Sequence, residues 1–272
     1  MKYEKISLAL IMGGLLFSSL SMSARADDGT LTVGTEGDAP QFSMADANGN
    51  VTGYDADVAN AICKEMKVKC KFVVQSFSTL IPSIDTNRFD VIISGLGITD
   101  ERKKKIDYSI PYGSAPQYFA VAKGSPIASM TSLAEVLKAL DGKSIGVVNG
   151  TTYARYIAKN IPTADLKTYD STTQLTADFA AGRLDAAFGD APTWADFLKT
   201  SDGANFTRVE IKVRSSDDPT TLGQGMGVGL RKGNTELKAK LDKAICALIK
   251  DGTMTKVSQT WFSDDYTLSC KL

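Results

Sequence analysis

One short segment of the sequence carries the groups expected of a carboxylate-binding site. Residues 94–102 read Ser-Gly-Leu-Gly-Ile-Thr-Asp-Glu-Arg, which places open backbone, a hydroxyl and an arginine within one turn of a predicted helix start. An arginine fork can pair with a carboxylate through charge-assisted hydrogen bonds, each contributing about 1.5 to 3 kcal/mol. The alternative is that Arg102 belongs to a solvated cationic run with residues 103–105. The candidate binding residues of this segment are Ser94, Gly95, Gly97 and Arg102.

Three further polar segments follow predicted strands, namely residues 36–38, residues 150–153 and Asp190. Asp190 ends an apolar stretch and could accept a hydrogen bond from a ligand ammonium group, although an Asp at this place also serves as a helix cap. Thr151 and Thr152 follow another predicted strand and could offer hydroxyl donors, although a simple ST-turn explains these residues equally well. Phe77 is a candidate hydrophobic wall, with core packing as its alternative. The candidates added here are Glu36, Asp38, Phe77, Thr151, Thr152, Tyr153 and Asp190.

No catalytic set is evident in the sequence. The chain has no His, no G-x-S-x-G elbow and no Walker loop, so neither general-base nor phosphate chemistry has its usual residues. No cofactor and no metal site are expected. The even number of cysteines instead favours two disulfides, Cys63 with Cys70 and Cys246 with Cys270, with free thiols or metal ligation as the alternative. Neither pair has the C-x-x-C spacing of a zinc site.

The amino end predicts export. Lys2 and Lys5 precede a mainly apolar run over residues 6–20, and the small residues that follow end in Ala24-Arg25-Ala26. This pattern is typical of a cleaved signal peptide over residues 1–26, and it predicts export into an oxidising compartment. No Cys lies near the cleavage site, so no lipid anchor is expected. Basic and acidic residues both number 31, a balance that gives no electrostatic footprint for nucleic acid. A monomer is expected.

Strands alternate with helices in two series that must position these side chains. The first is predicted over a strand at 31–34, a hairpin at 42–54, a helix at 55–66, a strand at 71–74, a helix at 80–87 and a strand at 90–94. The second covers a strand at 144–148, a helix at 153–160, a strand at 166–169, a helix from Ser171 to Gly182 and a strand at 186–188. A strand at 227–230, a helix at 234–251 and a last helix around Trp261 follow. This order indicates an α/β protein.

The two series share a sequence pattern. Arg88-Phe89-Asp90 leads into one strand, and Arg183-Leu184-Asp185 leads into its counterpart. Two α/β lobes are therefore expected. Ligands bind beyond the carboxyl ends of strands in open α/β sheets, because the loops there present backbone donors at helix starts. Two facing lobes would gather the candidate residues around one cleft.

Together these segments resemble the polar amino-acid family of periplasmic solute-binding proteins that serve ABC importers, which includes histidine, lysine/arginine/ornithine and opine binders. The similarity runs through almost all of the chain after residue 26. Its most specific pieces are Gly53-Tyr54-Asp55-Ala56-Asp57, Leu80-Ile81-Pro82-Ser83, residues 94–102, Gly150-Thr151-Thr152, residues 181–186 and residues 227–232. The spacing of Cys63 and Cys70 also matches a disulfide of the basic amino-acid branch.

The resemblance implies a type II periplasmic-binding-protein fold with two crossovers. One lobe would comprise residues 27–115 with 222–272, the other residues 116–221, and the ligand would lie between them. Arg102 would bind the α-carboxylate with help from the backbone near Gly95 and Gly97 and from Thr152. Asp190 would bind the α-ammonium group, and Phe77 would pack on the side chain. An inner-membrane ABC permease would be the partner.

Departures from the family pattern bear on the ligand. Asp38 precedes Ala39 and Pro40 where many relatives place an aromatic residue, so one aromatic wall is missing. Gly97 replaces the usual Ser or Thr and leaves room beside the carboxylate clamp, as in the opine-binding branch. Glu36 matches an acidic residue that faces cationic side chains, and Asp38 adds a second carboxylate. A cationic amino acid or an arginine-derived opine is expected; the alternative is an exported dehydratase-like enzyme on the same scaffold.

Overall fold

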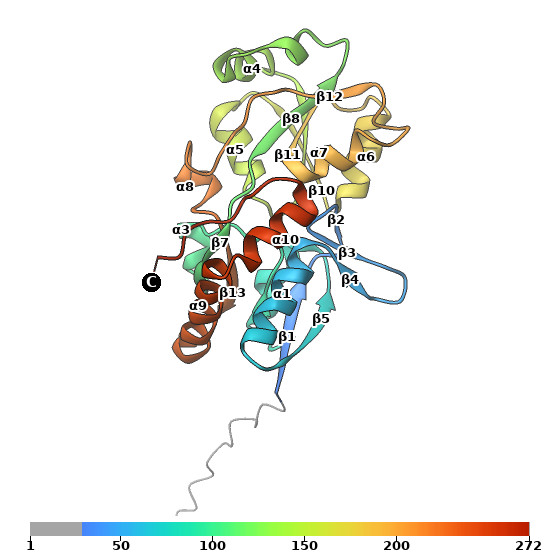
Figure 1. The fold of residues 1–272 in the computed structure, drawn as a ribbon. Helices are drawn as coiled ribbons and strands as arrows, with labels where there is room; N and C mark the ends of the chain where they lie inside the picture. The colour runs from blue at the N-terminus through green and yellow to red at the C-terminus, as the bar shows by residue number, and fades with distance from the viewer. Residues whose placement is uncertain (1–28, 272) are drawn as a thin grey trace, which may run out of the picture.

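Two five-stranded sheets form the centres of two lobes (Figure 1). The computed structural model describes residues 29–271, and the predicted signal peptide at residues 1–26 lies outside them. Lobe 1 contains the sheet of order β5-β1-β6-β13-β7, formed by Lys69–Val74, Thr30–Thr35, Val91–Ile92, Met226–Arg231 and Ile106–Gly113. Lobe 2 contains the sheet of order β10-β9-β11-β8-β12, formed by Asp165–Tyr169, Ser144–Val148, Ala186–Asp190, Gln117–Ala122 and Phe206–Arg208.

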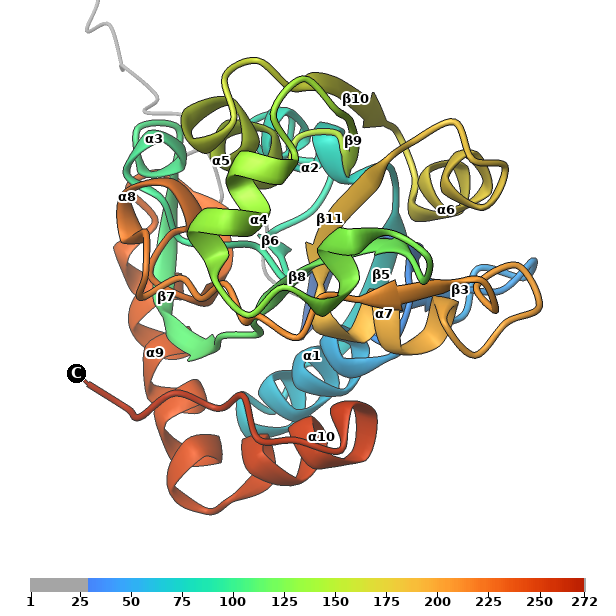
Figure 2. The ribbon, with the colours of Figure 1, turned by 90° about the horizontal axis from the view of Figure 1, so that it is seen from above.

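The chain passes between the lobes twice. It leaves lobe 1 between β7 and β8, and it returns between β12 and β13, which pairs antiparallel with β6 and β7 of the first sheet. The helices after β13 then pack on the core of lobe 1 together with α1, so the carboxyl segment belongs to that lobe. Figure 2 shows these helices, α9 and α10, beside α1. The fold is the two-lobed α/β arrangement expected from the sequence.

Helices cover both sheets. Those of lobe 1 are α1 (Tyr54–Glu65), α2 (Phe77–Ile84), α3 (Asp100–Lys103), α9 (Thr235–Lys250) and α10 (Thr253–Phe262). Those of lobe 2 are η1 (Pro126–Ser129), α4 (Leu133–Ala139), α5 (Tyr153–Asn160), α6 (Thr172–Ala180), α7 (Ala191–Phe197) and α8 (Pro219–Leu222). A small antiparallel sheet stands between β1 and α1, formed by β2 (Asp38–Ala39), β3 (Ser43–Ala45) and β4 (Val51–Thr52). Within residues 29–271, no helix has the length and apolar character needed to cross a membrane.

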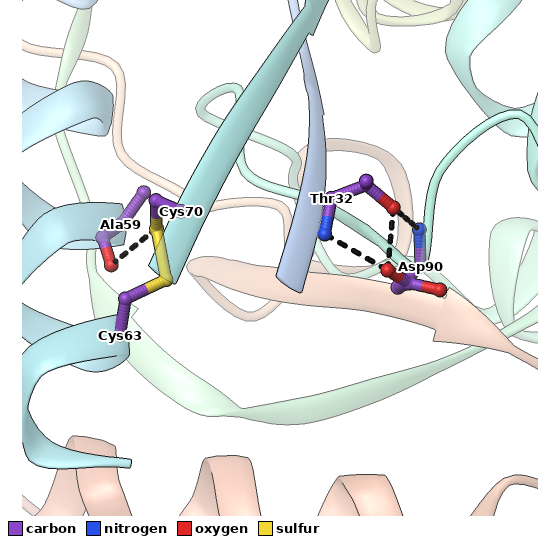
Figure 3. Close-up of a disulfide and its surroundings, with 5 residues drawn as sticks. All are labelled: Thr32, Ala59, Cys63, Cys70 and Asp90. Carbon is purple, nitrogen blue, oxygen red and sulfur yellow. Dashed lines mark hydrogen bonds between the residues drawn. A yellow bond between two sulfur atoms is a disulfide. The ribbon is translucent and has the colours of Figure 1, made fainter. Parts of the chain in front are cut away.

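The Arg-x-Asp pattern that occurs in both halves of the sequence corresponds to the same set of hydrogen bonds in each lobe. In lobe 1, Asp90 accepts hydrogen bonds from the backbone and the hydroxyl of Thr32, and its own N–H donates to that hydroxyl (Figure 3). In lobe 2, Asp185 makes the same three contacts with Ser144. Each aspartate thus ties the start of one inner strand to the start of its parallel neighbour. The repeated Arg-x-Asp pattern marks the same position in both sheets.

The bounds of one helix were predicted wrongly, and two strands were not predicted at all. Helix α2 was expected over residues 80–87, but it begins at Phe77 and ends at Ile84, and Asn87 has a left-handed φ of 57° that no regular helix can continue. Strands β7 and β8 were not predicted, because a stretch rich in Gly, Ser and Pro at residues 111–116 ends the first and precedes the second. Pro111 is tolerated because β7 lies at the edge of its sheet, where a missing N–H breaks no ladder.

Both cysteine pairs form disulfides. Cys63 at the end of α1 is bonded to Cys70 in β5, with the two Cα atoms 5.8 Å apart (Figure 3). Cys246 in α9 is bonded to Cys270 in the carboxyl tail, with a Cα separation of 5.2 Å. The first bond closes the turn between a helix and the next strand. The second holds the tail against the long helix of lobe 1.

Candidate functional site

A cavity lies between the two lobes, at the carboxyl ends of their inner strands. Loops after β1 and β6 approach it from lobe 1, and loops after β9 and β11 approach it from lobe 2. Among the predicted site residues, those that line the cavity are Glu36, Phe77, Ser94, Gly95, Gly97, Arg102, Thr151, Thr152, Tyr153 and Asp190. Asp38 is the predicted residue that does not. The sheet geometry thus brings together groups that are far apart in the sequence.

Arg102 is buried although it opens a cationic run. Thr99 caps the short helix α3 by accepting a hydrogen bond from the N–H of Arg102, and this turns the arginine inward, where it is 7% exposed. Lys103 is partly buried, and Lys104 and Lys105 are exposed. The guanidinium also lies 5.5 Å from the centre of the Phe77 ring. The alternative of a solvated charge run therefore does not apply to Arg102.

The guanidinium of Arg102 spans the two lobes. Its Nη1 donates to the carbonyl of Gly97 and its Nη2 to the carbonyl of Gly150, both at 2.9 Å. Burial lowers the pKa of Arg102, but an arginine keeps its charge in proteins. These two partners are neutral carbonyls, so the positive charge is not neutralised by them. Such a buried cation at a cavity wall favours an anionic group in the cavity.

Asp190 ends β11 and faces the cavity from lobe 2. It stands at the N-cap position of α7, but its side chain makes no capping hydrogen bond. Instead its carboxylate accepts hydrogen bonds from Gln117 Nε2 at 3.0 Å and from the hydroxyl of Tyr153. Burial raises the pKa of Asp190, and the two hydrogen bonds oppose this rise. The helix-cap alternative therefore does not account for this side chain.

Glu36 is a buried acid with one oxygen left unpaired. The residue is 6% exposed, and its N–H donates to the hydroxyl of Ser94 at 3.0 Å, which fixes the loop after β1. Its Oε1 has no hydrogen-bond partner among the described residues. Burial raises the pKa of Glu36 to about 8, with smaller contributions from the charges of Asp38, Asp55 and Asp190. A cation placed here would offset both the burial and the repulsion.

Gly97 leaves space beside the arginine. A Cβ atom at this position would lie 3.4 Å from Arg102 Nη1, 3.5 Å from the carbonyl of Leu222 and 4.0 Å from Thr152 Cγ2. Any longer side chain would enter the space between Arg102 and Thr152. Two other predicted site residues have their donors engaged within the protein. Gly95 donates its N–H to Asp55 of α1 at 3.0 Å, and Thr151 donates its hydroxyl to the carbonyl of Val148 at 2.6 Å.

Comparison with known proteins assigns this architecture to a family. Residues 31–264 match the family described as bacterial extracellular solute-binding proteins, family 3. The chain belongs to this family. The solute-binding fold therefore covers nearly all of the described residues, and the cavity between the lobes is the place where the two halves of that fold meet.

Relatives of this solute-binding protein carry names of binding proteins. The lysine/arginine/ornithine-binding periplasmic protein of Escherichia coli (strain K12) is 37% identical over 96% of this chain and 97% of its own. The octopine-binding periplasmic protein of Rhizobium meliloti is 30% identical over 96% of this chain and 99% of its own. The solved structure of an ancestral arginine-binding protein bound to arginine is similar with a TM-score of 0.74 and 36% identity, over 86% of this chain and 98% of that one.

The solute-binding protein uses Asp38 differently from the expectation. Both oxygens of its carboxylate accept hydrogen bonds from Thr173, one from the N–H at 3.0 Å and one from the hydroxyl at 2.7 Å. The first-turn N–H groups of a helix lack partners within the helix, and α6 presents that of Thr173 to Asp38. Asp38 thus lies outside the cavity lining, and both of its carboxylate oxygens contact lobe 2.

Several residues of the cavity wall were missed by the sequence analysis. Gln117 starts β8, a strand that was not predicted, so its contact with Asp190 had no local signal. Trp194 is fully buried, and its indole N–H donates to the carbonyls of Tyr118 and Gly189. The returning segment contributes Leu222, Gly225 and Met226. These residues have ordinary core or turn character, and only the three-dimensional arrangement places them at the site.

Proposed function

We propose that this solute-binding protein captures a cationic amino acid, or an opine derived from arginine, and delivers it to an inner-membrane ABC permease from the periplasm. The unpaired, buried carboxylate of Glu36 is the observation that carries the choice of a cationic ligand. The named relatives bind ligands of these classes. The export pattern of residues 1–26 and the periplasmic relatives support the location.

The charges along the cavity match the three polar groups of such a ligand. Arg102 offers its positive charge to the α-carboxylate, since its present partners are neutral carbonyls. Asp190 offers a carboxylate to the α-ammonium group, and Glu36 meets the cationic end of the side chain. A ligand that carries one anionic and two cationic groups would satisfy all three residues. Buried charges are stable only when they are paired, so this complementarity is the basis of the proposal.

Calorimetric titration against a panel of ligands tests the proposal. The panel contains arginine, lysine, ornithine, histidine, glutamine, glutamate and octopine. We expect binding of at least one cationic ligand and, above pH 8 where Glu36 is ionised, none of glutamate, because its second carboxylate would face the Glu36 carboxylate. Gly97→Ser should weaken octopine by about tenfold or more relative to arginine, since the serine fills the space beside Arg102. Binding restricted to acidic or apolar amino acids would overturn the cationic assignment.

Cation binding should be coupled to proton release from Glu36. The ligand-free pKa is about 8, so the side chain is neutral below that pH. A bound cation favours the ionised form and lowers the pKa. Arginine affinity should therefore rise with pH by up to about tenfold per unit and level off above about 8. Glu36→Gln should remove this rise and weaken arginine binding.

Titrations in two buffers of different ionisation enthalpy measure the released proton. Glutamine serves as the control ligand, because a neutral side chain gives Glu36 no reason to ionise. A pH dependence that is unchanged by Glu36→Gln would contradict the assignment of Glu36 to the cation.

A further inference from the structure

The loop between β1 and β3 contacts lobe 2 outside the ligand cavity. Asp38 of this loop accepts two hydrogen bonds from Thr173 at the start of α6. Ser171, the N-cap of α6, accepts a further bond from the N–H of Gln174 at 3.2 Å. The amino end of this lobe 2 helix is therefore capped both by its own residue and by a carboxylate from lobe 1.

A second contact reinforces the first. Gln41 Nε2 donates to Asp196 Oδ1 of α7 at 2.6 Å. Gln41 has a φ of 62°, a left-handed conformation that costs a non-glycine residue free energy. Its carbonyl accepts a hydrogen bond from the N–H of Tyr54 at 2.9 Å, so the first turn of α1 holds the loop in this conformation. The strained residue thus presents its side chain to the other lobe.

These four side chains are absent from the cavity lining. Their contacts depend on the approach of the two lobes and not on the ligand. Asp38 and Thr173 are 135 residues apart in sequence, and Gln41 and Asp196 are 155 apart, so each contact joins a loop of lobe 1 to a helix of lobe 2. An interaction present in only one of two conformations shifts the population toward that conformation.

We propose that the pairs Asp38–Thr173 and Gln41–Asp196 form a latch that stabilises the closed arrangement by the same amount for every ligand. The proposal rests on the proposed function in assuming that the lobes close around a ligand. A latch of this kind raises apparent affinity by raising the fraction of binding-competent protein, and it slows release. Asp38 is thereby a positioning residue that acts through α6 and sets affinity without setting ligand choice.

Two pairs of variants test the latch. Thr173→Val removes the hydroxyl donor from lobe 2 without a change of charge, and Thr173→Ser retains it. Asp38→Ala removes the acceptor, and Asp46→Ala is its control, because Asp46 lies beside the same small sheet and its carboxylate accepts hydrogen bonds from the nearby Asn48 and Asn50. The measurements are the closed fraction of ligand-free protein, by fluorescence transfer between labels on the two lobes, and the release rates of arginine and one other bound ligand.

We expect Thr173→Val and Asp38→Ala to reduce the closed fraction and to speed release of both ligands by a similar factor, about three- to tenfold. The variant that combines Asp38→Ala with Thr173→Val should release ligand no faster than Asp38→Ala alone. The control variants Thr173→Ser and Asp46→Ala should release ligand at the rate of the unaltered protein. Unchanged release and closure in both test variants would overturn the proposal. So would an effect of Asp38→Ala on cationic ligands alone. If no ligand binds, the proposed function fails, but the closed fraction still decides the latch.

Discussion

Arg102→Ala should remove measurable binding of every ligand that carries an α-carboxylate. The guanidinium is buried, and its two hydrogen bonds go to the carbonyls of Gly97 and Gly150, so the charge available to a ligand at this wall comes from Arg102. Breaking a buried charge pair costs about 3 to 5 kcal/mol, which corresponds to a loss of roughly 100- to 4,000-fold in affinity. Calorimetric titration with the ligand found to bind most tightly measures the loss.

Two further variants make this result specific. Arg102→Lys keeps the charge but loses the planar fork, and we expect it to restore only part of the affinity. Lys103→Ala is the matched control, because Lys103 is the adjacent cation on the same helix and contacts Gln224 and Asp100 away from the cavity. Full affinity in Arg102→Ala would refute the carboxylate clamp. An equal loss in Lys103→Ala would show that the net charge of this helix matters and not the buried fork.

Gly150→Ala should prevent the lobes from closing fully. Gly150 has a φ of 76°, and a Cβ there would lie 2.7 Å from the Cα of Ser78, a backbone atom of lobe 1 that cannot move as a side chain can. Overpacking of this kind costs about 1 to 3 kcal/mol, or roughly 5- to 150-fold in affinity. The same change should displace the Gly150 carbonyl that accepts a hydrogen bond from Arg102. Titration and small-angle scattering measure the loss and the more open shape.

Gly142→Ala is the control for backbone strain. Gly142 lies in the same lobe with a φ of 67°, but its Cβ would meet nothing within 4 Å. Both substitutions carry the cost of a left-handed alanine, so both should lower the free energy of unfolding of lobe 2. Only Gly150→Ala should weaken ligand binding. Equal affinities in the two variants would contradict the close approach of lobe 2 to Ser78.

The sequence was sufficient to predict the parts of the site that depend on local patterns. Strand β9 and helix α5 have the predicted bounds, because an apolar run and an amphipathic period each lie within a short stretch of chain. Loops at strand ends then placed Arg102 and Asp190 at one edge of their sheets. Both follow from the rule that carboxyl ends of parallel strands share an edge.

Contacts between the lobes could not be predicted in this way. The ligand role expected of Asp38 came from its place in the family pattern, before Ala39 and Pro40 and near Glu36, but its partner Thr173 is 135 residues away in sequence, and no local pattern pairs the two. Gln117 was missed because its strand follows the Gly-, Ser- and Pro-rich stretch at residues 111–116, which has no strand pattern. Long-range pairing, and not local propensity, decides these positions.

A crystal structure of the protein with its ligand tests the central claim most directly. We expect the α-carboxylate on the guanidinium of Arg102, the α-ammonium group on Asp190, and the cationic end of the ligand within hydrogen-bonding distance of Glu36 Oε1, which has no partner among the described residues. A ligand bound in the reverse orientation, or one that leaves Glu36 without a partner, would refute these assignments.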